Sequence, residues 1–233
     1  MAQQQLTVAG DSISLEVAQT CIGRYCSAPA TRWEPDPSRV VQIDADRLRF
    51  FADGYRSYDC IPGGPDRELL PVDILVAAGL GAGLQQGAVD ALLGLLPELN
   101  QVIADISDPA PCFWELSREE LFDEGGIAAF GSPMWTAWAL LMNLQGVTIL
   151  TTHAILHHKF PTLYPLLDRR TVGHFSRRSQ AWKETHEDLV RDADAWTELE
   201  NWHRDAIVPR SPAGAVPLNR LRLHAVILDT RTV

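Results

Sequence analysis

A carboxylate lies beside a short run of cations near residue 170 of this chain. Asp168 is followed by Arg169 and Arg170, and His174 and Arg177 come soon after. A carboxylate in a pocket can accept a proton from an amine while cations hold an anionic leaving group. The pattern predicts Asp168 as a catalytic residue and the four cations as ligands of an anionic substrate. An aspartate after an apolar run is also an ordinary helix N-cap, so Asp168 alternatively caps a helix that starts near Arg169 or Arg170.

Two tryptophans upstream are candidates for the wall of the same site. Trp135 and Trp138 stand at positions i and i+3, which puts both on one face of a helix. We predict that they line the substrate pocket. The alternative is plain core packing, which aromatic pairs with this spacing often adopt.

The charge balance argues against a protein that scans DNA. The 233 residues carry a formal net charge of −10, and non-specific DNA binding comes mainly from lysines and arginines that neutralise phosphates. Residues 159–183 are nevertheless locally cationic, with Asp168 as their single acid, and a predominantly acidic helical segment follows over residues 184–205. Such a small patch fits one phosphate or sulfate group better than a duplex. Alternatively, its arginines pair with the acidic segment.

Three histidines raise the question of a metal site. His153 and His157 are spaced to share one helical face, and His158 follows. The glutamate of an HExxH zinc site is missing, and no third ligand is evident. The chain also has no Gly-x-Ser-x-Gly elbow or Walker loop, and the glycines of residues 79–83 follow no strand. We therefore expect no metal and no cofactor, with the first two histidines exposed or at the edge of the core.

The cysteines and apolar segments indicate a cytoplasmic protein that does not enter the membrane. The N-terminus has no charged leader followed by an apolar core, and the longest apolar run, residues 74–84, is too short to cross a bilayer. The cysteines lack the paired spacing of a zinc finger, so we expect reduced core thiols. They are Cys21, Cys26, Cys60 and Cys112.

Helical patterns dominate the chain, so we predict a mainly α fold, with residues 1–233 forming a single helical domain. Ser132 and Pro133 are typical of a helix start. The stretch 218–228 fits a strand or a helix by pattern alone. Further helices are expected over residues 6–26, 43–58 and 71–96, with an extension over 99–106.

Residues 144–172 resemble the helix-hairpin-helix DNA glycosylases. In that superfamily a Leu-Pro-Gly-Val-Gly hairpin precedes a helix and then a segment that presents a catalytic aspartate. The resemblance implies a divergent glycosylase-like fold with a hairpin-like module over residues 133–175, and a role for Asp168 in stabilising a sugar cation or orienting a nucleophile. The matching residues are Leu144, Gly146, Val147 and Thr151 in the hairpin and helix start, and Leu167, Asp168 and Val172 in the aspartate segment.

Two departures from that pattern remove known chemistry. Thr148 stands where the second hairpin glycine would let backbone N–H groups approach a phosphate closely. Leu150 stands where bifunctional glycosylases carry a Schiff-base lysine, and leucine cannot be a nucleophile. The resemblance therefore implies a weakened DNA clamp and no lyase activity.

More globally, the chain resembles an uncharacterised group of actinobacterial proteins that combine a YD segment, a PxDIL-type segment, the degenerate hairpin and a terminal LxRLR segment. Here Tyr58 and Asp59 form the first, and residues 71–75 and 218–222 form the second and last. We include Tyr58 and Asp59 among the candidate substrate-binding residues. Ala225 and Asp229 stand where the group carries an acidic and aromatic pair.

Three functions are consistent with these residues. We favour an enzyme, or an enzyme subunit, for a small metabolite that bears an amine and a sulfate or phosphate. Its setting would be actinobacterial secondary metabolism such as antibiotic biosynthesis, and one candidate reaction is aziridine-type ring closure by amine displacement of the anionic group. The first alternative is a divergent monofunctional DNA glycosylase or DNA-lesion binder, with duplex DNA the less expected partner. The second is a non-catalytic subunit that docks a protein partner, or a second copy of itself, through the tryptophans of the acidic segment.

Overall fold

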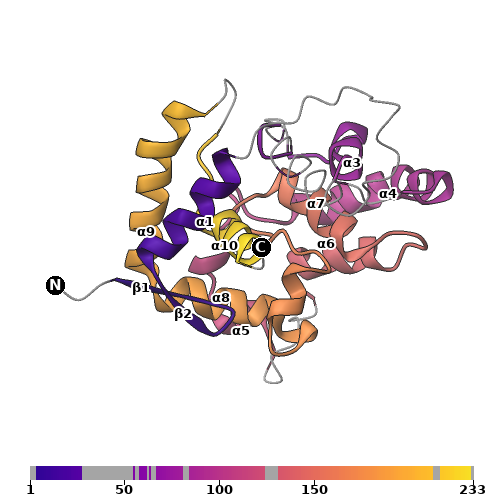
Figure 1. The fold of residues 1–233 in the computed structure, drawn as a ribbon. Coiled ribbons are helices and arrows are strands. Elements are labelled where there is room, and N and C mark those ends of the chain that lie inside the picture. Colours follow the sequence, from indigo (N-terminus) through magenta and orange to yellow (C-terminus); the bar gives the residue numbers. More distant parts are fainter. Residues whose placement is uncertain are drawn as a thin grey trace, which may run out of the picture.

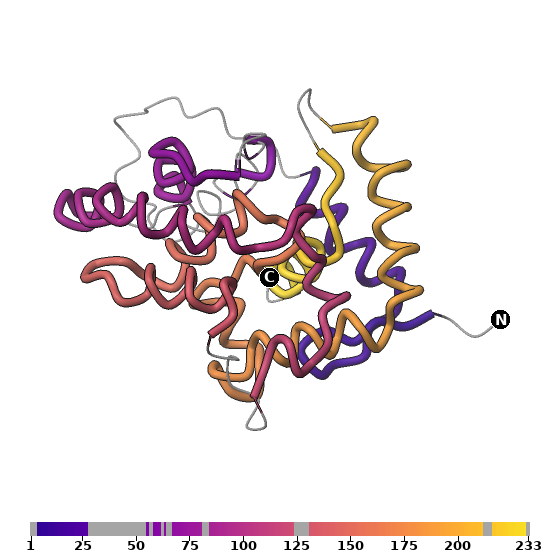
Figure 2. Tube along the Cα trace, turned by 180° about the vertical axis from the view of Figure 1, so that it is seen from behind, coloured from indigo at the N-terminus to yellow at the C-terminus, as the bar shows by residue number. Residues whose placement is uncertain are grey.

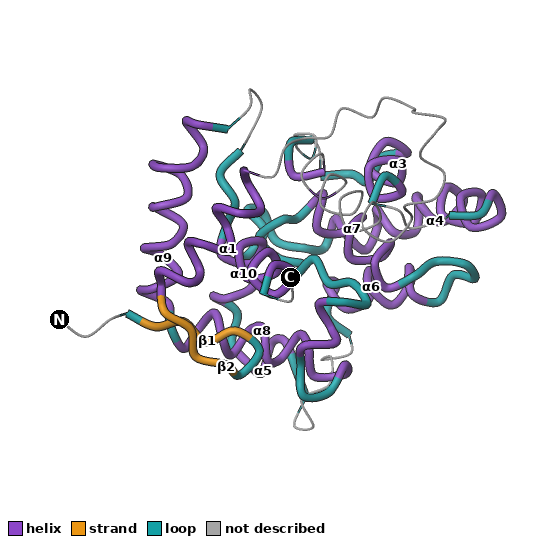
Figure 3. Tube along the Cα trace, in the orientation of Figure 1, coloured by secondary structure: helices purple, strands orange, loops and turns teal. Residues whose placement is uncertain are grey.

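The structure is a computed structural model of the chain, and the residues it describes are mainly helical, as the sequence predicts (Figures 1 and 3). It describes residues 4–27, 55, 58–61, 63, 67–80, 84–123, 131–211 and 216–231. Most of the helix expected over residues 43–58 lies outside these residues. Among the described residues, no helix is long and apolar enough to cross a bilayer.

The chain begins with a β-hairpin, where the sequence pattern predicted a helix. Strand β1 (Gln5–Val8) pairs antiparallel with β2 (Asp11–Ser14), and helix α1 (Leu15–Ser27) starts only after the second strand. Ala9 and Gly10 at the turn have φ of 52° and 82°, the left-handed pair that a tight hairpin turn requires. The expected helix over 6–26 is therefore wrong over residues 6–14, where the two strands pair and β1 buries every second side chain.

One half of the molecule is a group of four helices. Helix α3 (Pro71–Ala78) packs against α7 (Ile149–Lys159), and α4 (Gln86–Ala104) packs against α6 (Pro133–Met142). Figure 1 shows this group on the right of the molecule. The single helix predicted over 71–96 is thus two helices, since α3 ends at Ala78 and Gly79 caps it.

Local capping explains where α6 and α7 begin. The Ser132 hydroxyl accepts a hydrogen bond from the Trp135 backbone N–H, and the Thr148 hydroxyl accepts one from the Thr151 N–H. The helix start predicted at Ser132 and Pro133 is confirmed. Gly146, in the turn between the two helices, has a φ of 83°, a conformation that favours glycine.

The other half is built around the C-terminal helix. Helix α10 (Arg220–Thr230) is buried at every residue from Leu221 to Leu228, so the stretch of ambiguous pattern is a core helix. Helices α1, α8 (Ala181–Arg191) and α9 (Ala193–Trp202) pack around it. Viewed from behind, α9 and α1 flank α10 on the side away from the four-helix group (Figure 2).

Short helical turns complete the described fold. They are Phe113–Glu115, Arg118–Leu121 (α5), Thr171–His174 (η2), Arg178–Gln180, the π-helical His203–Ile207 and Val208–Arg210.

The structure shows which tryptophans and cysteines belong to the core. Trp196 of the acidic segment and Trp182 just before it are buried within the chain, so they are not exposed anchors for a partner. Of the four cysteines, Cys21 is buried, Cys26 and Cys112 are half-buried, and Cys60 is exposed. The expectation of four core thiols is therefore wrong.

Candidate functional site

The Asp168 carboxylate organises the turn that follows it. Its Oδ1 accepts hydrogen bonds from the backbone N–H groups of Arg170 and Thr171, both at 2.8 Å, and from the Thr171 hydroxyl at 3.1 Å. Its Oδ2 accepts one from the Tyr55 hydroxyl at 2.8 Å. Asp168 therefore caps the turn that leads into η2, as one of its two interpretations predicts, and its catalytic role stays a prediction. A carboxylate has about four acceptor positions, so most of those on Asp168 are already occupied.

The buried ion pair between Arg222 and Asp59 lies next to Tyr55, which donates to Asp168. The Arg222 guanidinium donates to both oxygens of Asp59, at 2.8 and 3.0 Å, and to the Tyr25 hydroxyl at 3.0 Å. The guanidinium also lies over the Tyr55 ring, 5.2 Å from its centroid. Burial alone would lower the pKa of Arg222, but the charge of Asp59 raises it well above its ordinary value. The predicted ligand Asp59 is thus committed to holding α10 against the segment that carries Tyr55.

Tyr58, the other residue of the YD segment, is also internal. Its hydroxyl donates to the backbone carbonyl of Ala154 in α7 at 2.9 Å, and its side chain is buried. The contact joins the YD segment to the four-helix group. Neither residue of this segment is an exposed ligand in the structure, and their predicted substrate contacts remain predictions.

Arg170 and His174 lie in a group of ionisable side chains that includes Asp229. Arg170 forms an ion pair with Asp229 at 3.2 Å, and the two side chains are 36% and 19% exposed. Burial raises the pKa of Asp229, Arg170 lowers it, and the charge of Asp168 raises it. Burial and the charge of Arg231 lower the pKa of His174, and Asp229 and Asp168 oppose this. Two carboxyl groups, one imidazole and one guanidinium therefore lie close enough to influence one another's charge, in a partly exposed part of the structure.

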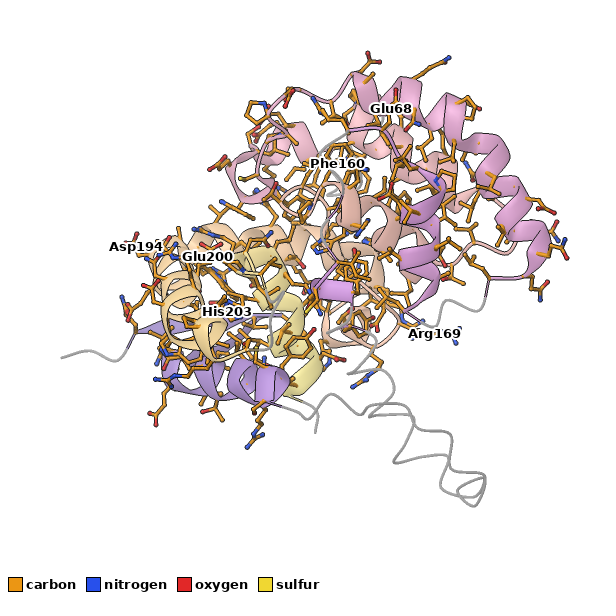
Figure 4. All side chains as sticks on the ribbon, turned by 90° about the horizontal axis from the view of Figure 1, so that it is seen from above. Glu68, Phe160, Arg169, Asp194, Glu200 and His203 are labelled. Carbon is orange, nitrogen blue, oxygen red and sulfur yellow. The ribbon has the colours of Figure 1, made fainter. Side chains whose placement is uncertain are left out.

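The remaining predicted cations lie at the surface. Arg169 and Arg177 are exposed, and within the described part of the chain neither side chain forms a hydrogen bond or an ion pair. Figure 4 shows Arg169 at the edge of the molecule. Lys159 is different, because its ammonium lies 3.3 Å from Asp73 and its side chain is 2% exposed. The sequence wrongly grouped it with the surface patch.

The two predicted tryptophans belong to an aromatic cluster. Trp135 is buried against Trp182, and its indole N–H donates to the Leu121 carbonyl at 2.7 Å. Trp138 is half-buried and donates to Nε2 of His153 at 3.3 Å. Trp135 thus follows the core alternative. A pocket-lining role for the pair remains a prediction.

His153 and His157 are buried, and the expectation of an exposed or edge position is wrong. Their Nδ1 atoms contact the backbone carbonyls of Pro165 at 2.6 Å and Tyr164 at 2.7 Å. Burial lowers the pKa of each to about 4, against the opposing effect of those carbonyls. Both rings are therefore neutral Nδ1–H donors at neutral pH that hold the segment leading to Asp168 onto α7.

His158 lies in a buried charge cluster with Asp73 and Lys159. Its Nδ1 lies 2.8 Å from Asp73 Oδ1, and its Nε2 lies 3.1 Å from the Ile61 carbonyl. Asp73 also accepts the Leu70 N–H at 2.7 Å, which caps α3. Burial would raise the pKa of Asp73, but these hydrogen bonds and Lys159 lower it overall. Among the described residues, no group of three or more metal-ligating side chains is close enough to hold an ion.

Sequence reasoning missed three residues that build this site: Tyr55, Arg222 and Asp229. The available signal was a charge inside an apolar stretch, because Arg222 interrupts the run 218–228. A buried arginine in a core helix needs a partner. That partner, Asp59, is far away in the sequence, and no local pattern could pair the two.

Comparisons with known proteins place the described motifs in one family. A family model described as a family of unknown function (DUF6308) matches residues 48–231. The match includes the YD segment, residues 71–75 and the terminal segment with Arg222. No curated protein and no solved structure matches the chain.

Proposed function

The chain belongs to the DUF6308 family of unknown function, and we propose that it is an enzyme, or an enzyme subunit, for a small metabolite that carries an amine and a sulfate or phosphate. The proposal assigns proton transfer to His174 and electrostatic control of that transfer to three neighbouring charged groups. We call the four side chains the proton-transfer cluster: Asp168, Arg170, His174 and Asp229. The secondary-metabolism setting and the glycosylase-like ancestry of the scaffold are part of the same proposal.

One observation carries the proposal. Asp229 has a raised pKa and His174 a lowered one, and each lies in the field of Arg170 and of Asp168. Surroundings that shift the pKa values of neighbouring titratable groups are typical of sites for acid–base catalysis. The partial exposure of both Arg170 and Asp229 gives a small molecule access to the cluster.

The reaction can be written with these groups in defined roles. The amine nitrogen attacks the carbon that bears the sulfate or phosphate, forming a C–N bond. The C–O bond breaks, and the oxyanion leaves with its electron pair. The proton lost from nitrogen passes to unprotonated His174, and the charges of Asp168 and Asp229 favour the resulting imidazolium. Intramolecular attack closes a ring, as in aziridine formation.

The glycosylase resemblance keeps a second candidate, a DNA glycosylase or DNA-lesion binder. The supporting observation is the turn between α6 and α7, where Gly146 has a positive φ and Thr148 caps α7. Fluorescence anisotropy with abasic and intact duplexes tests it. Tight binding that weakens steeply with salt supports this candidate, and no binding at low salt removes it.

The test of the favoured function is release of the inorganic anion. Amine-bearing sulfate and phosphate monoesters are incubated with the protein, and free sulfate or phosphate is measured. We expect release by the wild type and by the surface control Arg178→Gln, whose side chain is exposed, and a rate at least about 100-fold lower for His174→Asn. Absence of release from every ester, or equal rates for His174→Asn and the wild type, would contradict the proposal.

A further inference from the structure

An open depression of about 380 Å³ lies between the turn of the β-hairpin and helix α8. Figure 1 shows the hairpin beside α8. Its size is at the lower end of pockets that hold small metabolites. None of the four proton-transfer residues lines it. The lining residues are Gly10, Ser176, Arg177, Gln180, Lys183, Glu184, Glu187, Asp188 and Arg191.

Two of the three acidic side chains in this lining form hydrogen bonds with other parts of the protein. Glu184 accepts hydrogen bonds from the backbone N–H and the hydroxyl of Ser176. Asp188 Oδ2 accepts the Ala9 N–H at 2.7 Å and lies 3.1 Å from Nε2 of His224, and its side chain is buried. These carboxylates hold the hairpin and the 175–180 loop onto α8, so each of them already has a structural role.

The third acid is only loosely engaged. Glu187 faces Lys183 across 3.8 Å, as an i,i+4 pair on α8. Both side chains are partly exposed, and an exposed pair of this kind contributes little to stability because water screens it. An anion entering the depression can therefore recruit the Lys183 ammonium without breaking a strong contact.

The two arginines in the lining have no such partner. Within the described ranges, the Arg177 and Arg191 side chains form no hydrogen bond and no ion pair, and both are exposed. A guanidinium presents a planar set of donors that matches phosphate and sulfate oxygens. The unused binding capacity of the depression is thus cationic, although its formal charge is balanced.

We propose that this depression binds the oxyanion of a small phosphorylated or sulfated metabolite. Arg177 and Arg191 are the ligands of the oxyanion, and Lys183 is the supporting cation. The space beyond one tetrahedral anion takes the body of the metabolite.

The depression and the proton-transfer cluster share a segment of chain. His174 belongs to the cluster, and Ser176 and Arg177 line the depression. The charge of Arg231 lowers the pKa of His174. The Arg231 guanidinium also donates hydrogen bonds to the Val8 carbonyl and the Asp11 carboxylate, on either side of the hairpin turn. Calling the bound metabolite the substrate rests on the proposed function. The binding of an oxyanion does not.

The experiment is a titration with inorganic phosphate and, separately, inorganic sulfate at constant ionic strength, followed by amide chemical shifts. We expect saturable shifts at Gly10, at residues 176–180 and along α8. The double variant Arg177→Gln/Arg191→Gln should weaken binding at least tenfold. Arg178→Gln is the matched control, because Arg178 is exposed and adjacent to Arg177 but does not line the depression. It should bind as the wild type does.

Three results would overturn the inference: no saturable binding of either anion, full binding by the double variant, or an equal loss in Arg178→Gln. All three substitutions are at exposed positions, so unchanged far-UV circular dichroism is expected and confirms that the variants fold. If phosphate binds but no ester releases its anion, the proposed function fails and this inference stands. If esters react at the same rate in the double variant and no anion binds, only this inference fails.

Discussion

Replacing Asp59 by asparagine should destabilise the protein by about 3 kcal/mol or more, because it leaves the Arg222 charge buried without its partner. The two side chains are 9% and 5% exposed, and the guanidinium meets both carboxylate oxygens. Removing one member of a buried, hydrogen-bonded ion pair typically costs about 3–5 kcal/mol. Asparagine keeps the shape and one acceptor oxygen, so the loss reports the charge more than the packing.

A second aspartate in the chain serves as the matched control. Asp11 pairs with Arg231 at 2.8 Å, the same distance as in the Asp59–Arg222 pair, but the Asp11 side chain is 70% exposed. Water screens such a pair, which is worth about 0–1 kcal/mol. Asp11→Asn should therefore lower the free energy of unfolding by no more than about 1 kcal/mol.

Urea denaturation at pH 7, followed by circular dichroism, measures both free energies of unfolding. The account requires Asp59→Asn to lose at least about 2 kcal/mol more than Asp11→Asn. Equal losses in the two variants would refute the argument that burial makes the Asp59–Arg222 pair structural. That result would leave the carboxylate of Asp59 available for its predicted role as a substrate ligand.

Two further predictions concern stability. Burial lowers the pKa of His153 and His157 from 6.5 to about 4, so the unfolded state takes up protons first as the pH falls. The free energy of unfolding should then decrease between about pH 6.5 and pH 4, by on the order of 5 kcal/mol for the pair. The midpoint urea concentration of the wild type should fall over this range, and the double substitution of both histidines by asparagine should make it nearly independent of pH. Gly63→Ala should cost about 2 kcal/mol in urea denaturation, since its Cβ would lie 2.2 Å from the His158 carbonyl oxygen. Gly87→Ala, in open space on α4, should be neutral or stabilising by up to about 1 kcal/mol, and the opposite order would contradict the packing argument.

The helices with strong local signals could be predicted from the sequence. Ser132 followed by Pro133 marks the start of α6 because both residues act locally, one through its hydroxyl and one through its fixed φ. The alternative role of Asp168 as a cap is equally local, since its partners are the N–H groups of the next residues. The sequence pattern did not predict the N-terminal hairpin. Its turn depends on the positive φ of Gly10, and the sequence alone does not distinguish such a glycine from one inside a helix.

The candidate site could be predicted only in part. Asp168, Arg170 and His174 are neighbours in the sequence, and the fold keeps them together. Tyr55 and Asp229 join them through contacts between distant segments. Asp229 lies on α10, whose sequence pattern fitted a strand equally well. The depression was also hidden, because its cations and acids look balanced until the internal partners of the acids are known.

The proton-transfer cluster is tested most directly by carbon-13 NMR of the Asp229 carboxyl group during a pH titration, in the wild type and in Asp168→Asn. In the wild type we expect the pKa of Asp229 to be above its ordinary value. Removing the Asp168 charge should lower the pKa of Asp229, and that of His174 measured in the same samples, because that charge raises both. An ordinary pKa for Asp229 that does not change in Asp168→Asn would contradict the account.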